Sequence, residues 1–391
     1  MKPSLAWLVT TAGTRRPNLT VEQGRLMRVL HIIDSLNCGG AEVMLTAMAP
    51  LFRSRNVVCD VIALMRRPSP LEASLLNEGI SLRYTGVQQL YSPRQISALS
   101  GMLAGYDIIH VHLFPAQLWA VLAAMRSGCK APLVATEHNT WNSRRRWWLR
   151  PIDRWMYSRY SRIACISEAT AKALEEWCPG VKDKILVIPN GVPLEQFENA
   201  PPAMLDIPPS FARVVFVGRC VPQKDHATLL RAVTASPNIH LLLVGDGPLR
   251  SQLEEMARSL GIAQRVSFLG WRSDIASLLR ASDIYVHSTH SDGFGIAACE
   301  AMAAGLPVLA SDVPGLAEVV AGAGVLFPPR DHQALANHLN ALVQSPEIRH
   351  EMSRASLQRA RQFSIEMTVD SCIRLYESML HVYVPETAGA R

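Results

Sequence analysis

The sequence predicts an α/β protein of two doubly wound domains that face each other across a cleft. Short runs rich in valine, isoleucine and leucine alternate with segments of helical spacing, a pattern typical of parallel sheets covered on both faces. A proline-rich interval at 193–210 divides these runs into two series, and such proline density is typical of a linker. The length of 391 residues also exceeds the size at which one hydrophobic core stops growing.

The expected strands are the short apolar runs themselves. In the N-terminal series they lie at 28–33, 57–64, 107–112, 132–136, 162–166 and 185–188, and in the C-terminal series at 213–217, 239–244, 265–269, 283–287, 307–310 and 324–327. Residues 331–383 have helical spacing and predict a helical end of the chain. Ligands of open parallel sheets bind at the carboxyl ends of the strands, so we expect the chemistry in the loops that follow them.

Residues 1–26 show neither strand alternation nor a helical stripe, and Met27 directly precedes the first strand. We interpret this segment as a disordered or mis-assigned leader. The rest of the chain is expected to form an N-terminal domain at 27–200, a linker at 201–210, a C-terminal domain at 211–365, and a C-terminal helix and tail at 366–391. We expect that last helix to pack back onto the N-terminal domain.

Composition narrows the class of protein. A formal net charge of +6 favours anionic partners, and no recognition motif for nucleic acid accompanies it. No run of 18 apolar residues predicts a membrane-spanning helix, and the apolar run at 5–9 is too short for a signal peptide. The eight cysteines show neither C-x-x-C nor zinc spacing, so we interpret them as small core residues in a reducing compartment. We therefore expect a cytoplasmic protein.

Two loops after predicted strands carry groups suited to a phosphate. In the loop at 34–42, Gly39 and Gly40 let the backbone approach an anion, and the following helix presents free N–H groups. This signal alone is weak, because paired glycines before a helix often form only a tight turn. In the C-terminal domain, Arg219 and Lys224 are placed to reach one pyrophosphate and offset its charge. The alternative is a solvated basic turn, although Lys224 is one of only six lysines.

The most specific run contains Asp292 and Glu300, eight positions apart, with a Gly-x-Gly turn and a helix start between them. The N–H groups of residues 294–296 can meet a phosphate at this helix end. Glu300, one turn into the helix, can accept hydrogen bonds from two ribose hydroxyls, as carboxylates do in nucleotide sites. The alternative, a plain glycine-containing loop, would not require two flanking carboxylates.

Taken together, these loops resemble the retaining GT-B glycosyltransferases of family GT4, whose Glu-x7-Glu motif matches 292–300. Further matching blocks are Gly-Gly-Ala-Glu at 39–42, Asp-Ile-Ile-His-Val-His at 107–112, Thr-Glu-His-Asn at 136–139, Ile-Pro-Asn-Gly-Val at 188–192 and Leu-Val-Gly-Asp-Gly-Pro at 243–248. The resemblance extends from about residue 28 to 330 and is specific as a combination of blocks. It implies two Rossmann-like domains, with the acceptor on the N-terminal side and the nucleotide-sugar donor on the C-terminal side.

The resemblance also implies roles for single residues. Gly40 backs the donor pyrophosphate, Arg219 and Lys224 clamp it, and Glu300 holds the ribose. His138 corresponds to the histidine that touches the sugar near the reacting carbon. The implied catalytic residues are His138, Asp292, Arg219 and Lys224, and the implied donor-binding residues are Gly39, Gly40, Asn190, Arg219, Lys224, Gly245, Phe294, Gly295, Ile296 and Glu300.

Asp292 departs from the family pattern, because the family usually has glutamate there and aspartate is one methylene shorter. Its contact with the transferred sugar is therefore expected to be shifted or water-bridged, which leaves the donor sugar open. Among the other histidines, His110 and His112 end a strand, and we interpret His110 as a hydrogen-bonded core residue. His287 and His290 precede the key loop and receive no role.

The implied function is retaining transfer of a hexose from a UDP- or GDP-sugar to an acceptor, in the synthesis of cell-surface polysaccharide, lipopolysaccharide or a lipid-linked glycan. No metal and no cofactor are expected, because no Asp-x-Asp motif lies beside the pyrophosphate loops and the nucleotide sugar is itself a substrate. A GT-B nucleotide-sugar epimerase and a non-catalytic nucleotide-sugar-binding subunit stay open as alternatives. A phosphorylase fits less well, because it would need a lysine for pyridoxal phosphate deep in the C-terminal domain. The only lysine after residue 185 is Lys224, which is already placed at the pyrophosphate.

The stretch at 141–157 combines arginines with tryptophans. If helical, it places Arg146, Arg150 and Arg154 along one side and Trp148, Ile152 and Trp155 on another. Such faces suit an anionic lipid surface, and the protein would then lie at the inner face of the plasma membrane as a peripheral protein. The alternative is a helix that buries its tryptophans in the N-terminal domain.

Overall fold

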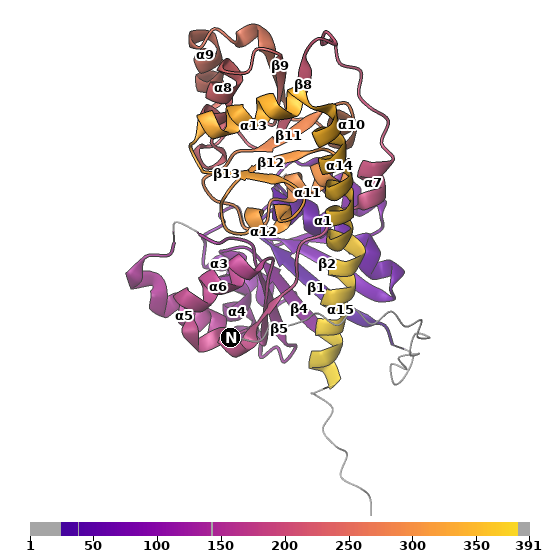
Figure 1. Ribbon diagram of the computed structural model, residues 1–391. Coiled ribbons are helices and arrows are strands. Elements are labelled where there is room, and N and C mark those ends of the chain that lie inside the picture. The colour runs from indigo at the N-terminus through magenta and orange to yellow at the C-terminus, as the bar shows by residue number, and fades with distance from the viewer. Residues whose placement is uncertain (1–24, 38, 142–143, 382–391) are drawn as a thin grey trace, which may run out of the picture.

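The computed structural model describes residues 25–37, 39–141 and 144–381, and it contains two parallel sheets with helices packed on both faces (Figure 1). Within these residues, the strands of the N-terminal sheet are β1 (Met27–Ile33), β2 (Val57–Ala63), β3 (Ser81–Tyr84), β4 (Ile108–His112), β5 (Leu133–Glu137), β6 (Arg162–Cys165) and β7 (Ile185–Val187). Those of the C-terminal sheet are β8 (Ala212–Val217), β9 (Ile239–Val244), β10 (Val266–Gly270), β11 (Ile284–His287), β12 (Val308–Ser311) and β13 (Val325–Phe327). The predicted two-domain α/β class is therefore confirmed.

The strand order places the carboxyl ends of β1 and β4 side by side, and likewise those of β8 and β11. The N-terminal sheet has the order β3-β2-β1-β4-β5-β6-β7, and the C-terminal sheet has the order β10-β9-β8-β11-β12-β13. In each sheet the order reverses beside the first strand of the domain. Since ligands of doubly wound folds bind at that reversal, the loops after β1 and β8 are the expected places for a ligand.

The α-helices connect and cover the strands. They are α1 (Gly40–Ser54), α2 (Pro70–Asn77), α3 (Arg94–Ser100), α4 (Ala116–Ser127), α5 (Arg150–Ser158), α6 (Glu168–Trp177), α7 (Leu194–Glu198), α8 (His226–Thr234), α9 (Arg250–Ser259), α10 (Ile275–Arg280), α11 (Ile296–Ala303), α12 (Leu316–Val320), α13 (His332–Gln344), α14 (Pro346–Ala360) and α15 (Ile365–His381). Short 3-10 turns include η1 (Trp147–Leu149) and η3 (Pro222–Lys224).

Two elements differ from the sequence prediction. β3 was not predicted, because it is a four-residue edge strand that is mostly half-buried and has no continuous apolar run. α7 lies inside the proline-rich interval that was interpreted as a linker, and Phe197 anchors it in the core of the C-terminal domain. Residues 201–208 carry neither helix nor strand, and a turn at 209–210 leads into β8.

The chain crosses between the domains twice. After α14 it returns to the N-terminal domain, where α15 packs along α1 (Figure 1). Ile365, Val369 and Tyr376 recur at helical spacing on the buried face of α15, and the Tyr376 hydroxyl lies 2.6 Å from Nδ1 of His110 in β4. The two crossings run side by side, since Val192 forms a parallel bridge with Ser364.

Most of the predicted leader lies outside the described residues, which begin at Arg25. Arg25 forms an exposed ion pair with Asp107 at 3.2 Å, just before β1. Among the described helices, none is both long and apolar enough to cross a bilayer. The described cysteines are all free and mostly buried, consistent with small core residues.

Candidate donor and acceptor sites

The amino ends of α1 and α11 meet where the two domains face each other. A β-carbon added at Gly40 would lie 3.1 Å from Cδ1 of Ile296, so the first residues of the two helices are in contact range. Arg219 is exposed and follows β8 in the C-terminal domain. Burial raises the pKa of Glu42 in α1, and the positive charge of Arg219 opposes part of that rise, so the two charges are within electrostatic range of each other.

Lys224 and Asp292 form an ion pair in this cleft, with 2.6 Å between Nζ and Oδ2. The other carboxylate oxygen of Asp292 accepts hydrogen bonds from the backbone of Phe294 at 3.2 Å and Gly295 at 2.9 Å. Two of the three N–H groups that were expected to meet a phosphate are therefore occupied by Asp292. Burial alone would raise the pKa of Asp292, but the Lys224 ammonium holds it well below its usual range.

Glu300 presents a carboxylate without a hydrogen-bond partner among the described residues, one turn into α11. Burial raises its pKa to about 7. A buried carboxylate is costly unless its oxygens accept hydrogen bonds. Its unfilled acceptor capacity makes it suited to a ligand that brings hydroxyl donors, such as a ribose.

The remaining donor-site candidates shape the cleft more than they reach into it. Gly245 has φ of +132°, and a β-carbon there would overlap the carbonyl of Gly218, so the loop after β9 can lie directly on the end of β8. The Phe294 side chain is buried in the core of the C-terminal domain. Gly39 is the N-cap of α1, and Asn190 is buried in the loop after β7.

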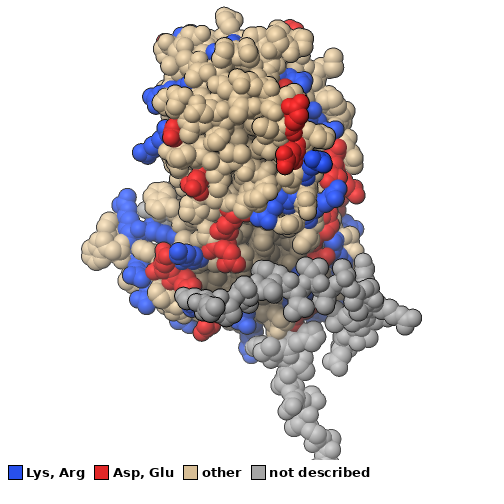
Figure 2. Space-filling view, in the orientation of Figure 1, with Lys and Arg blue, Asp and Glu red and all other residues tan. Residues whose placement is uncertain are grey.

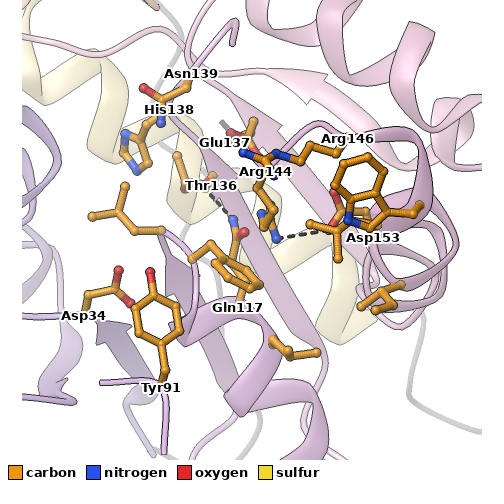
Figure 3. Close-up of a pocket in the computed structure, with 16 residues that line it drawn as sticks. Asp34, Tyr91, Gln117, Thr136, Glu137, His138, Asn139, Arg144, Arg146 and Asp153 are labelled. Atoms are coloured by element: carbon orange, nitrogen blue, oxygen red, sulfur yellow. Dashed lines mark hydrogen bonds and ion pairs between the residues drawn. The ribbon is translucent and has the colours of Figure 1, made fainter. Parts of the chain in front are cut away.

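His138 follows β5 and lines a pocket of about 750 Å³ in the N-terminal domain (Figure 3). Figure 3 shows Asp34 and Tyr91 at one side of the pocket and Arg146 and Asp153 at the other. Burial raises the pKa of Asp34 to about 7, although the Ala116 N–H donates to its carboxylate. Sequence reasoning gave Asp34 no role, because one carboxylate after a strand is unremarkable until a pocket surrounds it.

The pocket wall is held rigidly. Arg144 forms an ion pair with the buried Asp153 at 3.0 Å, and its guanidinium lies 3.6 Å from the centre of the Phe114 ring. Asp153 also accepts a hydrogen bond from the Trp177 indole at 2.9 Å. The wall between the pocket and α5 is therefore fixed by buried polar contacts.

The donor loop and the His138 loop are in direct contact. A β-carbon at Gly293 would overlap the carbonyl oxygen of His138. The Gly293 carbonyl accepts a hydrogen bond from the Ser167 hydroxyl at 2.7 Å. Nearby, Glu318 of the C-terminal domain accepts hydrogen bonds from the first N–H groups of α6 at 2.6 and 2.9 Å. These contacts join the two halves of the site.

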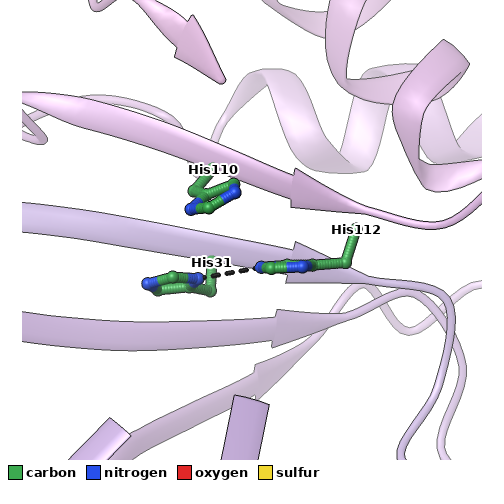
Figure 4. Close-up of side chains that lie close together, drawn as sticks. All are labelled: His31, His110 and His112. Carbon is green, nitrogen blue, oxygen red and sulfur yellow. Dashed lines mark hydrogen bonds between the residues drawn. The ribbon is translucent and has the colours of Figure 1, made fainter. Parts of the chain in front are cut away.

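Three buried histidines, His31, His110 and His112, lie close together (Figure 4), and the row that they form is extended by His138. Its Nε2 lies 3.4 Å from Nδ1 of His112, whose Nε2 lies 3.0 Å from Nδ1 of His31. His110 is hydrogen-bonded to Tyr376 and to Thr136, both at 2.6 Å, which agrees with its interpretation as a core residue. Burial lowers the pKa of all four histidines, so they are neutral at pH 7. We interpret the row as hydrogen-bonded support for His138.

The arginine and tryptophan stretch is not one helix. Residues 144–146 precede η1, and α5 begins only at Arg150, whose Nε donates to the Trp177 carbonyl at 2.8 Å. The single helix on which the predicted row of three arginines depended is therefore not formed, and only Arg150 and Arg154 lie in α5. The tryptophans of the stretch differ in exposure. Trp147 is 79% and Trp148 51% exposed, whereas Trp155 packs against the core of the N-terminal domain. In Figure 2, basic side chains gather at the edge of the N-terminal domain where Figure 1 places α5.

Comparison with known families covers both domains of the chain. Residues 38–196 match the model described as Glycosyltransferase Family 4, and residues 202–359 match Glycosyl transferases group 1. The chain belongs to the GT4 glycosyltransferases. The first match ends within α7 and the second begins before β8, and together they span most of the chain.

Relatives of this GT4 glycosyltransferase include proteins named as inositol phosphate glycosyltransferases and as phosphatidylinositol mannosyltransferases. It is 27% identical to a D-inositol 3-phosphate glycosyltransferase of Corynebacterium urealyticum, over 88% of this chain and 91% of the relative. It is 29% identical to a phosphatidyl-myo-inositol mannosyltransferase of Mycobacterium leprae, over 87% and 93%. The solved structure of Anabaena Alr3699/HepE in complex with UDP and glucose has the same fold, with a TM-score of 0.78 and 23% identity over 90% of this chain and all of that one (100%). The predicted GT-B fold and GT4 membership are confirmed.

Proposed function

We propose that this GT4 glycosyltransferase moves a hexose from a UDP- or GDP-sugar to its acceptor with retention at the anomeric carbon. The observation that supports it best is the Lys224–Asp292 ion pair beside α11, whose amino end meets that of α1, with Glu300 one turn into the same helix and without a hydrogen-bond partner among the described residues. The cations and the α1 amino end suit a diphosphate, and Glu300 suits a ribose. The related HepE, solved with UDP and glucose, has the same fold.

In the proposed reaction, the bond from C1 of the sugar to the β-phosphate oxygen breaks as the acceptor oxygen bonds to C1 on the same face. The acceptor's proton passes to the leaving phosphate. Arg219 and Lys224 stabilise the negative charge that grows on that phosphate. Neutral His138 stabilises the sugar from the N-terminal side, so the protein mainly orients two substrates. Retention through a covalent intermediate would need a carboxylate behind the sugar, and Asp292 is held by Lys224 and the α11 amino end.

The test is the configuration of the product. With UDP-glucose or another α-linked donor and a lipid extract as acceptor, proton NMR should show an α-linked sugar in the first product, with EDTA present. Activity should survive EDTA because arginine and lysine supply the positive charge that a metal gives elsewhere. A β-linked product would exclude retention. Activity lost in EDTA and restored by a divalent cation would exclude only the metal-free reaction.

We propose a lipid-linked acceptor that reaches the pocket from an anionic membrane surface. Arg146, Trp148 and Ile152 line the pocket and are also exposed at the edge of the domain. An acceptor with its sugar near His138 could thus keep its lipid part at the tryptophans. The mannosyltransferase relative, named for phosphatidyl-myo-inositol, supports a lipid acceptor. Such an enzyme would act as a peripheral protein at the cytoplasmic leaflet.

The protein is expected to sediment with anionic liposomes more than with neutral ones, and salt should release it, because exposed charges are screened within about 10 Å at 0.1 M salt. Replacing Trp147 and Trp148 by alanine should weaken sedimentation. The matched control is Trp271→Ala, which removes a 54% exposed tryptophan of the C-terminal domain. Equal sedimentation of wild type with neutral and anionic liposomes would leave a soluble acceptor as the better proposal.

A further inference from the structure

A buried histidine and tyrosine stand behind the ion pair of the donor site. His287 ends β11 and is 1% exposed, and its Nε2 lies 3.1 Å from the same Asp292 oxygen that binds Lys224. Its Nδ1 lies 3.1 Å from the hydroxyl of Tyr285, which is fully buried. Lys224 Nζ is 3.2 Å from His287 Nε2, so lysine and histidine approach one carboxylate oxygen from neighbouring directions.

The neutral imidazole has one N–H, and its surroundings decide which nitrogen carries it. Burial lowers the pKa of His287, and the Lys224 ammonium lowers it further, so the ring is neutral at pH 7. The Tyr285 hydroxyl lies beside Nδ1 and can donate its proton to that nitrogen. The ring proton is then on Nε2 and is donated to the Asp292 carboxylate, which can only accept.

This arrangement matters when the donor arrives. A diphosphate that binds Lys224 draws the ammonium from Asp292, and a buried carboxylate that loses its cation is costly unless hydrogen bonds remain. Asp292 keeps the Phe294 and Gly295 N–H groups on one oxygen. On the other oxygen, the His287 N–H is the partner that stays.

We propose that His287, held in one tautomer by Tyr285, is a positioning residue that keeps Asp292 hydrogen-bonded while Lys224 turns to the diphosphate of the donor. The inference rests on the proposed function for its diphosphate. It gives a role to the histidine that the sequence pattern left without one. It also explains why an aspartate can occupy the first position of the Glu-x7-Glu motif. The shorter side chain is held there by hydrogen bonds from His287 and from the backbone N–H groups at the start of α11.

The tautomer can be measured without any ligand. Nitrogen-15 NMR of side-chain-labelled protein should show one protonated nitrogen on His287, at Nε2, in wild type. Tyr285→Phe should weaken that preference, because the phenol that donates to Nδ1 is gone and only the Asp292 carboxylate still favours a proton on Nε2. Tyr106→Phe is the control, since it deletes a hydroxyl that bonds Asp60 at 2.6 Å outside the site. Protonation at Nδ1 in wild type would overturn the proposal.

Calorimetric titration with UDP and with GDP distinguishes a hydrogen-bonding role of His287 from a role in packing alone. His287→Leu removes the N–H and should lower the affinity for whichever nucleotide binds wild type by at least about tenfold. His287→Gln keeps an amide N–H near Nε2 and should stay within about threefold of wild type. Equal weakening in both variants, with unchanged melting, would overturn the proposal. If neither nucleotide binds wild type, the proposed function fails, and the tautomer measurement still decides whether His287 holds Asp292.

Discussion

Replacing Lys224 or Arg219 by alanine should lower kcat/KM by roughly 30- to 1000-fold, which is about 2–4 kcal/mol of transition-state stabilisation. In the proposed reaction, each cation faces the phosphate that gains negative charge as the glycosidic bond breaks, so its loss should appear in kcat as well as in KM. The effect should be larger for Lys224, because its removal also leaves the Asp292 carboxylate without its ion pair.

Melting temperatures distinguish a loss of donor contacts from a loss of folding stability in these variants. Lys224→Ala combined with Asp292→Asn removes both charges together, so its melting temperature should lie nearer to wild type than that of Lys224→Ala alone. Lys182→Ala is the matched control, since that lysine pairs with Glu175 on the surface of the N-terminal domain. Rates close to wild type in both Lys224→Ala and Arg219→Ala would remove these residues from the donor site.

Gly293→Ala is expected to abolish most of the transfer activity while each domain stays folded. The added methyl group would overlap the carbonyl oxygen of His138, and a backbone carbonyl in a strand-end loop has little freedom to move. The two domains should therefore be held apart at the point where donor and acceptor must meet. Misplacement by about 1 Å can cost on the order of a hundredfold in rate.

The variant should show a larger radius of gyration by small-angle X-ray scattering in the presence of the nucleotide, with a far-UV circular dichroism spectrum like that of wild type. Gly180→Ala is the control, because a β-carbon there would meet no atom within 4 Å. Full activity in Gly293→Ala would show that the contact between the two loops is dispensable.

Much of the fold was predictable because both sheets are parallel and buried, so their strands appear as continuous apolar runs. β3 was missed since an edge strand is under no such constraint, and α7 was missed since a short helix can sit between prolines. The loops that meet at the cleft were predictable from their glycines and charges. The hydrogen bonds and ion pairs that their polar atoms form with one another were not predictable.

Asp292 illustrates that limit. The family resemblance implies that Asp292 contacts the sugar, and nothing in the local sequence shows that Lys224, 2.6 Å away, arrives from a loop 68 positions earlier. His287 was equally hidden, because a histidine at a strand end is common and its importance depends on what the fold places beside each nitrogen. Tertiary distances decide such roles, and the spacing of residues along a chain does not contain them.

The double crossing between the domains has a consequence for how such enzymes can be recombined. A fragment ending near residue 200 would lack α15, which would expose the apolar face of α1 to water and leave His110 without its hydrogen bond to Tyr376. A chimaera that exchanges donor halves between relatives therefore needs two junctions, one near Val192 and one near Ser364. If both crossing segments come from one parent, each domain retains its own core. The donor-binding domain could then be exchanged between relatives as a unit.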